Sequence, residues 1–220
     1  MSLRVVVWDA TDVGRFRAGH DGANGTADVH IGLSPAWWVG ARLHAVARRL
    51  SGIEYHARGV RSWDEALRFA STCAHTAQAP LTELQVWGHG GWGFMDLGDT
   101  RLDRAALASA AMREPLDALA DVLAVDAQVW LRCCSAFGGR AGRAFAPALA
   151  TRLRARVVGH TYVIGVLQSG THSLDPGDRP TWPLEEGVVI RNGEPHSAKT
   201  SGAREPRTIG CLRLDLPRGF

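Results

Sequence analysis

The chain has 220 residues, of which 45% are hydrophobic and 21% charged, and its formal net charge is +3. No apolar run approaches the roughly 20 residues that cross a bilayer, and the opening MSLRVVVWDATD lacks the apolar core of a secretory signal. The basic residues are scattered rather than gathered in one block, which argues against a nucleic-acid partner. We therefore expect one globular domain over residues 1–220, located in the cytoplasm and without a membrane partner.

Short apolar runs alternate with helical stretches along the chain, a pattern typical of a sheet covered by helices. The first run, LRVVVW at residues 3–8, predicts a strand. After a glycine-rich loop over residues 14–32, Ser34 and Pro35 predict the N-cap and first turn of a helix. Apolar residues recur at helical spacing in that helix: Val39, Leu43, Val46 and Leu50.

The middle of the chain continues this alternation. A short strand is expected at residues 53–55, and the capping-box pattern from Ser62 to Glu65 predicts the start of a helix. One face of that helix carries Trp63, Leu67, Ala70 and Ala74. Further strands are predicted at residues 84–88, 94–97 and 127–132, and two alanine-rich helices at 103–112 and 114–123.

The last third of the chain predicts one more strong helix and then less regular structure. After the glycine turn at residues 138–139, apolar residues at helical spacing lead into a strand that begins at Val157. Composition predicts a long loop near residues 168–183, a late strand at 188–191 and a weakly structured tail near 201–220. The whole pattern predicts an α/β fold, a three-layer α/β/α sandwich with a mostly parallel central sheet.

Two of the predicted strands end in residues that can carry chemistry. LQVWGHGG ends at His89 and Gly90, and VWLRCCSAFGG ends at Cys133 and Cys134. Open α/β sheets bind substrates beyond the carboxyl ends of their strands, where a histidine can activate a thiol. We therefore predict Cys134 as nucleophile and His89 as its base. The backbone amides of Gly90 and Cys134 are the candidate oxyanion donors, and the start of the following helix favours negative charge at Cys134.

Other interpretations of these residues stay open. Side chains alternate across a strand, so only one of Cys133 and Cys134 can easily meet His89, and local sequence does not say which. His89 is also compatible with an ordinary turn, and either cysteine with a buried core thiol, as we expect for Cys73. No zinc-binding spacing occurs, so no metal or other cofactor is expected. A metal hydrolase built on scattered histidines is disfavoured for the same reason: His20, His30 and His160.

The two strand ends together resemble the caspase-like (clan CD) cysteine peptidases, and among them the bacterial CHAT and gingipain types. The matching segments are LQVWGHG and VWLRCCSA, and Cys134 follows His89 by 45 residues, near the ~50 of caspases. CSAFGGRAGRAFAPALA followed by RVVGHT extends the resemblance to roughly residues 80–165. The resemblance implies His89 as base, Gly90 as oxyanion glycine and Cys134 as nucleophile, with Cys133 in the small-residue position.

The resemblance implies a cysteine endopeptidase that forms an acyl-enzyme with a protein or peptide substrate and has a possible regulatory protein partner. The alternative is a noncatalytic caspase-like domain that binds other proteins. The chain reads Arg-Cys-Cys-Ser-Ala where a caspase reads Gln-Ala-Cys-Arg-Gly, so caspase specificity for aspartate does not carry over. No specificity-pocket residue is assigned by motif, and the loop after the first strand could supply a pocket of either charge. We interpret its charged residues as solvated rather than as specificity residues: Asp12, Arg15, Arg17 and Asp21.

Overall fold

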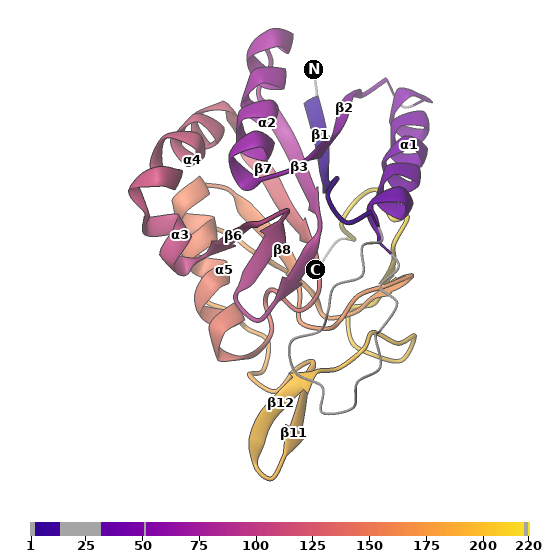
Figure 1. The fold of residues 1–220 in the computed structure, drawn as a ribbon, viewed down its shortest axis with the longest axis vertical. Coiled ribbons are helices and arrows are strands. Elements are labelled where there is room, and N and C mark those ends of the chain that lie inside the picture. Colours follow the sequence, from indigo (N-terminus) through magenta and orange to yellow (C-terminus); the bar gives the residue numbers. More distant parts are fainter. Residues whose placement is uncertain (1–2, 14–31, 51, 218–219) are drawn as a thin grey trace.

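The computed structural model describes residues 3–13, 32–50, 52–217 and 220 (Figure 1). Its central sheet has six strands in the order β10-β8-β7-β3-β1-β2. They are β1 (Leu3–Asp9), β2 (Glu54–Val60), β3 (Leu81–Trp87), β7 (Leu123–Arg132), β8 (Arg156–His160) and β10 (Thr171–Leu174). Neighbouring strands are parallel except β10, which pairs antiparallel with β8 at one edge. The predicted α/β fold with a mostly parallel sheet is confirmed.

Four helices cover one face of the sheet: α2 (Trp63–Ala77), α3 (Arg104–Ala108), α4 (Ala110–Val122) and α5 (Gly139–Leu153). Their buried faces meet alternate strand residues, such as Val5 of β1, Leu84 of β3 and Val129 of β7, in the main apolar core. The capping pattern at the start of α2 is formed, because the Ser62 side chain accepts a hydrogen bond from the Glu65 amide. This face is therefore a continuous apolar layer of helix against sheet.

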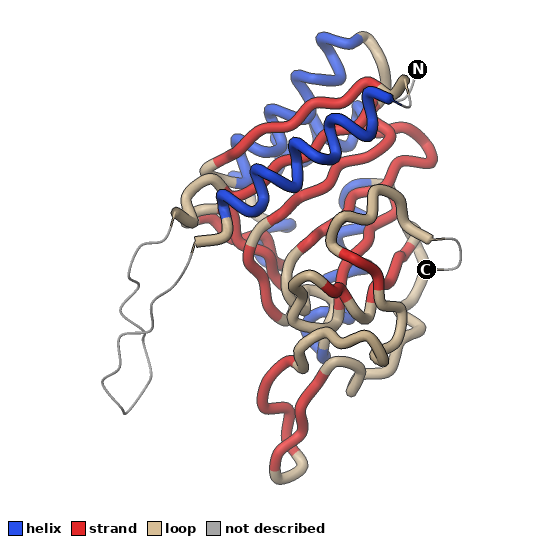
Figure 2. The backbone as a smooth tube through the Cα atoms, turned by 90° about the vertical axis from the view of Figure 1, so that its right-hand side faces the viewer, coloured by secondary structure: helices blue, strands red, loops and turns tan. Residues whose placement is uncertain are grey.

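The opposite face is covered differently. The helix α1 (Ser34–Leu50) lies over β1 and β2, as Figure 2 shows, while the other helices lie behind the sheet. The rest of this face is covered by irregular chain from the C-terminal part, in which β13 (Ile209–Gly210) pairs with β9 (Leu167–Gln168). The tail is fixed to the sheet by polar contacts, including Arg4 to Asp215 at 2.6 Å and Gln85 to the Leu214 carbonyl at 3.3 Å.

The helix α1 forms as predicted, but its apolar stripe does not face the sheet. Val39, Leu43 and Val46 are exposed, while Gly40 and Ala41 are buried. A Cβ on Gly40 would lie 2.6 Å from the Trp87 ring, so the helix approaches the sheet through its small residues and a sheet tryptophan fills the interface. The burial of α1 therefore depends on small size rather than on apolar periodicity.

Other element boundaries also differ from the prediction; for example, β2 and β7 are longer than the predicted strands at 53–55 and 127–132. The two alanine-rich helices meet at Ser109, whose side chain accepts from the Met112 amide and caps α4. The segment near 168–183 contains β10, which the prediction treated as loop. Its residues are polar, but Thr171 and His172 are buried at the sheet edge, where their side chains form hydrogen bonds. The polar composition therefore predicts a loop where the structure has a strand.

The remaining strands form two small sheets outside the central one. The chain turns after β3 into β4 (His89–Gly91), β5 (Phe94–Leu97) and β6 (Thr100–Asp103). A hairpin of β11 (Val188–Arg191) and β12 (Glu194–Ala198) projects from the body at the bottom of Figure 1. Among the described residues, no helix has both the length and the apolar character needed to cross a bilayer.

Candidate active site

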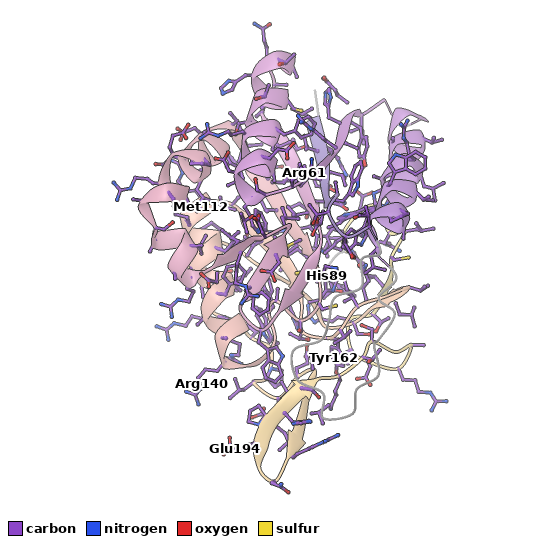
Figure 3. All side chains as sticks on the ribbon, in the orientation of Figure 1. Arg61, His89, Met112, Arg140, Tyr162 and Glu194 are labelled. Atoms are coloured by element: carbon purple, nitrogen blue, oxygen red, sulfur yellow. The ribbon has the colours of Figure 1, made fainter. Side chains whose placement is uncertain are left out.

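His89 directly follows the turn at the end of β3. Gly88 makes that turn possible, because a Cβ there would lie 2.7 Å from the Asp96 carbonyl oxygen. Alternation along β3 buries Leu84 and Val86 among the helices and turns Gln85, Trp87 and His89 toward the α1 face. His89 consequently lies beyond the strand ends, near the centre of the molecule in Figure 3, with its side chain 40% exposed.

The His89 ring is held by two neighbours that are distant in sequence. Its Nε2 atom lies 2.8 Å from Asp12 Oδ2, and the Trp37 ring packs edge-on against it at a centroid distance of 5.3 Å. Nε2 therefore donates to the carboxylate, which places the acceptor lone pair of the neutral imidazole on Nδ1. This is the arrangement in which a carboxylate orients a histidine that acts as a base.

The interpretation of Asp12 as a solvated loop charge is wrong. Its side chain is 10% exposed, and Oδ2 also accepts a hydrogen bond from the Leu33 amide at 2.8 Å. The Ser34 amide donates to the Asp12 carbonyl at 3.1 Å, so the start of α1 fixes this residue on both sides. The other loop charges, Arg15, Arg17 and Asp21, lie outside the described residues.

The structure distinguishes the two adjacent cysteines. Cys133 continues the row of Val129 and Leu131 into the helical core, where it is 1% exposed and burial raises the pKa of its thiol well above the ordinary value. Cys134 continues the row of Trp130 and Arg132 on the α1 face, and it is partly exposed. Cys134, not Cys133, therefore shares a face with His89, and its role as nucleophile stays a prediction.

The Cys134 thiol lies in a partly buried setting. Its Sγ atom is 3.9 Å from the Ile164 carbonyl oxygen. Burial raises the pKa of Cys134, and hydrogen bonding to the backbone of Ile164 opposes that shift only in part. The expected help from a helix start is not present, because α5 begins at Gly139, five residues beyond the cysteine. The resting group is therefore the neutral thiol.

The turns around the two residues bring their strand ends into contact. A Cβ on Gly90 would lie 2.6 Å from Cys133 Sγ and 3.0 Å from the Cys134 carbonyl oxygen, so β4 packs directly on the end of β7. Ser135 has φ 43°, and its amide donates to the Tyr162 carbonyl at 2.8 Å. This left-handed turn reverses the chain straight after Cys134 and ties it to the loop after β8.

His89 and Cys134 line the same cavity of about 360 Å³. Its walls come from the start of α1, the ends of β3 and β7, the loop after β8, and the tail at Cys211 and Leu212. All four cysteines of the chain are free thiols, and Cys73 is a core residue as predicted. A larger hollow at Arg113 and Arg154 lies between α4 and α5, and its arginines line a shallow surface remote from both strand ends.

The histidines considered for a metal site lie elsewhere. In the described ranges, no three His, Cys, Asp or Glu side chains come together as possible metal ligands. His160 is buried on β8 and accepts a hydrogen bond from the Trp130 indole at 3.3 Å. His20 and His30 lie outside the described residues.

Sequence comparison gives a family but no activity. Residues 53–182, which are 130 of the 220 residues, match the model of a family described as a domain of unknown function (DUF4347). A search of curated proteins found no match. The matched range includes His89 and Cys134, whereas Asp12, α1 and the tail lie outside it.

Proposed function

The chain belongs to the DUF4347 family, and from its strand ends we propose that it is a cysteine endopeptidase of the caspase-like type. Cys134 is the nucleophile, His89 the base, and Asp12 the residue that orients the His89 ring. The observation that carries the proposal is that Cys134 and His89 line one cavity while Asp12 lies 2.8 Å from His89 Nε2. A thiol, an imidazole and a carboxylate in this order are the components of nucleophilic acyl transfer.

The raised pKa of Cys134 determines how the thiol is activated. Because burial favours the neutral thiol, a stored thiolate–imidazolium pair is disfavoured, and His89 removes the proton as the sulfur attacks. The sulfur forms a bond to the carbonyl carbon of the scissile amide. The C–N bond then breaks, the amine leaves with the proton from His89, and the acyl group stays on sulfur as a thioester.

Hydrolysis of the thioester reverses these roles. A water molecule gives a proton to His89 and attacks the acyl carbon, the C–S bond breaks, and the thiol recovers the proton. The backbone amides of Gly90 and Cys134 are the proposed donors to the oxyanion in both steps. Gly90 is suited to this position because only a residue without Cβ allows β4 to approach the Cys134 backbone this closely.

Replacement of Cys134 tests the proposal. Wild-type protein and Cys134→Ala are compared on a pool of internally quenched fluorogenic peptides, with Cys73→Ala as a control for a thiol outside the cavity. We expect cleavage by the wild type and the control, and a loss of at least about 1,000-fold in the Cys134 variant. Full activity in Cys134→Ala would overturn the assignment.

Selective alkylation separates the proposal from a noncatalytic role. Iodoacetamide should modify Cys134 before Cys73, because burial raises the pKa of Cys73 to about 11. Modification of Cys134 without turnover of any peptide would favour the protein-binding alternative. Thiol chemistry of this kind also fits a reducing compartment such as the cytoplasm, where cysteines stay unpaired.

A further inference from the structure

The cavity beside Cys134 is walled mainly by apolar side chains. Trp37 comes from α1, Trp87 from the end of β3, and Ile164 from the loop after β8. Three more apolar residues at the cavity are strongly exposed: Val166 at 78%, Leu212 at 56% and Leu33 at 42%. Apolar side chains gathered around an opening gain free energy when a ligand covers them, about 25 cal/mol for each Å² removed from water.

Among the described residues that line the cavity, Arg132 is the one Asp, Glu, Lys or Arg, and its side chain is engaged in holding the wall together. Its residue is 4% exposed, Nη1 donates to the Cys211 carbonyl at 2.7 Å, and Nη2 donates to the Arg213 carbonyl. The guanidinium also lies 4.0 Å from the centre of the Trp130 ring. A substrate carboxylate would have to displace these contacts, so Arg132 holds the tail in place and does not select an acidic residue.

Gln168 supplies a polar group that a ligand can satisfy. Its side chain lines the cavity and is almost fully buried, and Oε1 has no hydrogen-bond partner among the described residues. A buried acceptor without a donor costs free energy, which a ligand N–H or O–H can recover. Tyrosine and tryptophan combine such a donor with a large apolar ring.

We propose that this cavity is the specificity pocket of the peptidase and takes a large aromatic side chain from the residue whose carbonyl Cys134 attacks. The inference rests on the proposed function, because it takes Cys134 as the nucleophile. A volume of about 360 Å³ lies near the lower end of the ~300–1,000 Å³ found for ligand pockets, which suits one bulky side chain. Charged side chains would lose hydration against these apolar walls, and none of the described acidic side chains lines the cavity to pair with a basic one.

Peptide aldehydes with different terminal residues test the pocket without requiring turnover. Aldehydes ending in Tyr, Trp, Asp or Lys compete with iodoacetamide, and modification is measured at Cys134 by peptide mass mapping, because Cys211 lines the same cavity. We expect the Tyr and Trp aldehydes to protect Cys134 at concentrations at least 10-fold lower than the Asp and Lys aldehydes. Equal protection by all four, best protection by Asp or Lys, or no protection would overturn the inference.

A charge at the cavity mouth gives an independent measurement. Leu212→Asp should lower kcat/KM for a fluorogenic Tyr peptide at least 10-fold, whereas Leu184→Asp, on an exposed leucine outside the cavity, should leave it unchanged. Cleavage that depends on Cys134 but prefers acidic or basic residues would overturn the pocket and leave the peptidase intact. Cleavage that does not depend on Cys134 would overturn the proposed function itself.

Discussion

The two faces of the central sheet are covered by different kinds of structure. On one face, four helices pack against alternate strand residues, and large side chains such as Trp63 and Phe145 are fully buried. On the other face, α1 approaches through Gly40 and Ala41, and the rest is covered by irregular chain from the C-terminal part. The cavity with His89 and Cys134 belongs to this second face.

Under the proposed function, stability depends on one face of the sheet and catalysis on the other. Because side chains alternate along β7, adjacent residues serve the two roles: Cys133 fills the helical core and Cys134 faces the cavity. Substitutions on the helical side should then change the free energy of unfolding, and those on the cavity side should change the rate of catalysis. The following predictions test that division.

The largest effect is expected on the cavity side. His89→Asn removes the base and should lower kcat/KM by about 1,000-fold while the free energy of unfolding stays within about 0.5 kcal/mol of the wild type. The matched control is His75→Asn, at an exposed position in α2, which should change neither quantity. Peptide cleavage and urea unfolding measure the two. An unfolding midpoint lowered along with activity would contradict the division.

A core substitution should give the opposite result. Leu149→Ala on α5 creates a cavity at a fully buried site and should cost about 2–5 kcal/mol of unfolding free energy, with kcat/KM per folded molecule unchanged. Val46→Ala, on the exposed stripe of α1, should cost less than about 0.5 kcal/mol. Equal costs at the two positions would mean that α1 is covered in solution.

Asp12 should have a moderate effect that differs in kind from that of His89. Asp12→Asn keeps the size of the side chain but removes the charge that stabilises a protonated His89, so kcat should fall about 10- to 100-fold. KM should stay within about 2-fold of the wild type, because Asp12 contacts the His89 ring and not the substrate. Asp99→Asn, on an exposed turn, is the control. An unchanged kcat would remove Asp12 from the site.

The last prediction concerns how the free energy of unfolding changes with each pH unit. Burial, together with the charge of Arg132, lowers the pKa of His160 to about 3. A histidine whose pKa is lower in the folded protein stabilises the fold fully above its ordinary pKa near 6.5, and this contribution is lost as pH falls toward 3. The slope should be up to about 1.4 kcal/mol per pH unit. Urea unfolding of wild type and His160→Gln, measured from pH 7 to 4, should diverge in this window, and parallel curves would contradict it.

The difference between the helical face and the cavity face could be predicted only in part from the sequence. Strand runs ending in His-Gly and Cys-Cys predict the two chemical residues, because strand ends are local features. The choice between Cys133 and Cys134 needs the layers, since the residues on both faces of β7 near its end are large: Val129, Trp130, Leu131 and Arg132. Only the positions of α1 and of the four other helices show which face of β7 is the helical core and which is the cavity face.

The sequence does not predict long-range polar contacts. Asp12 reaches His89 across 77 residues, and no periodicity marks a charged loop residue that meets a turn so far along the chain. The strand β10 is not predicted for a similar reason. Its buried Thr171 and His172 have polar side chains, which predict a loop unless their hydrogen-bond partners are known. In both cases the missing information is a hydrogen-bond partner distant in sequence.

Arg132 donates hydrogen bonds to the main-chain carbonyls of Cys211 and Arg213, and every amino acid has such a carbonyl. The side chains of residues 211–213 can therefore be exchanged without loss of the hydrogen bonds from Arg132. Because the DUF4347 match ends at residue 182, this exchangeable strip lies outside the part shared with the family. A change of side chain at Leu212 therefore alters the wall of the cavity and leaves the two bonds from Arg132 to the main chain in place.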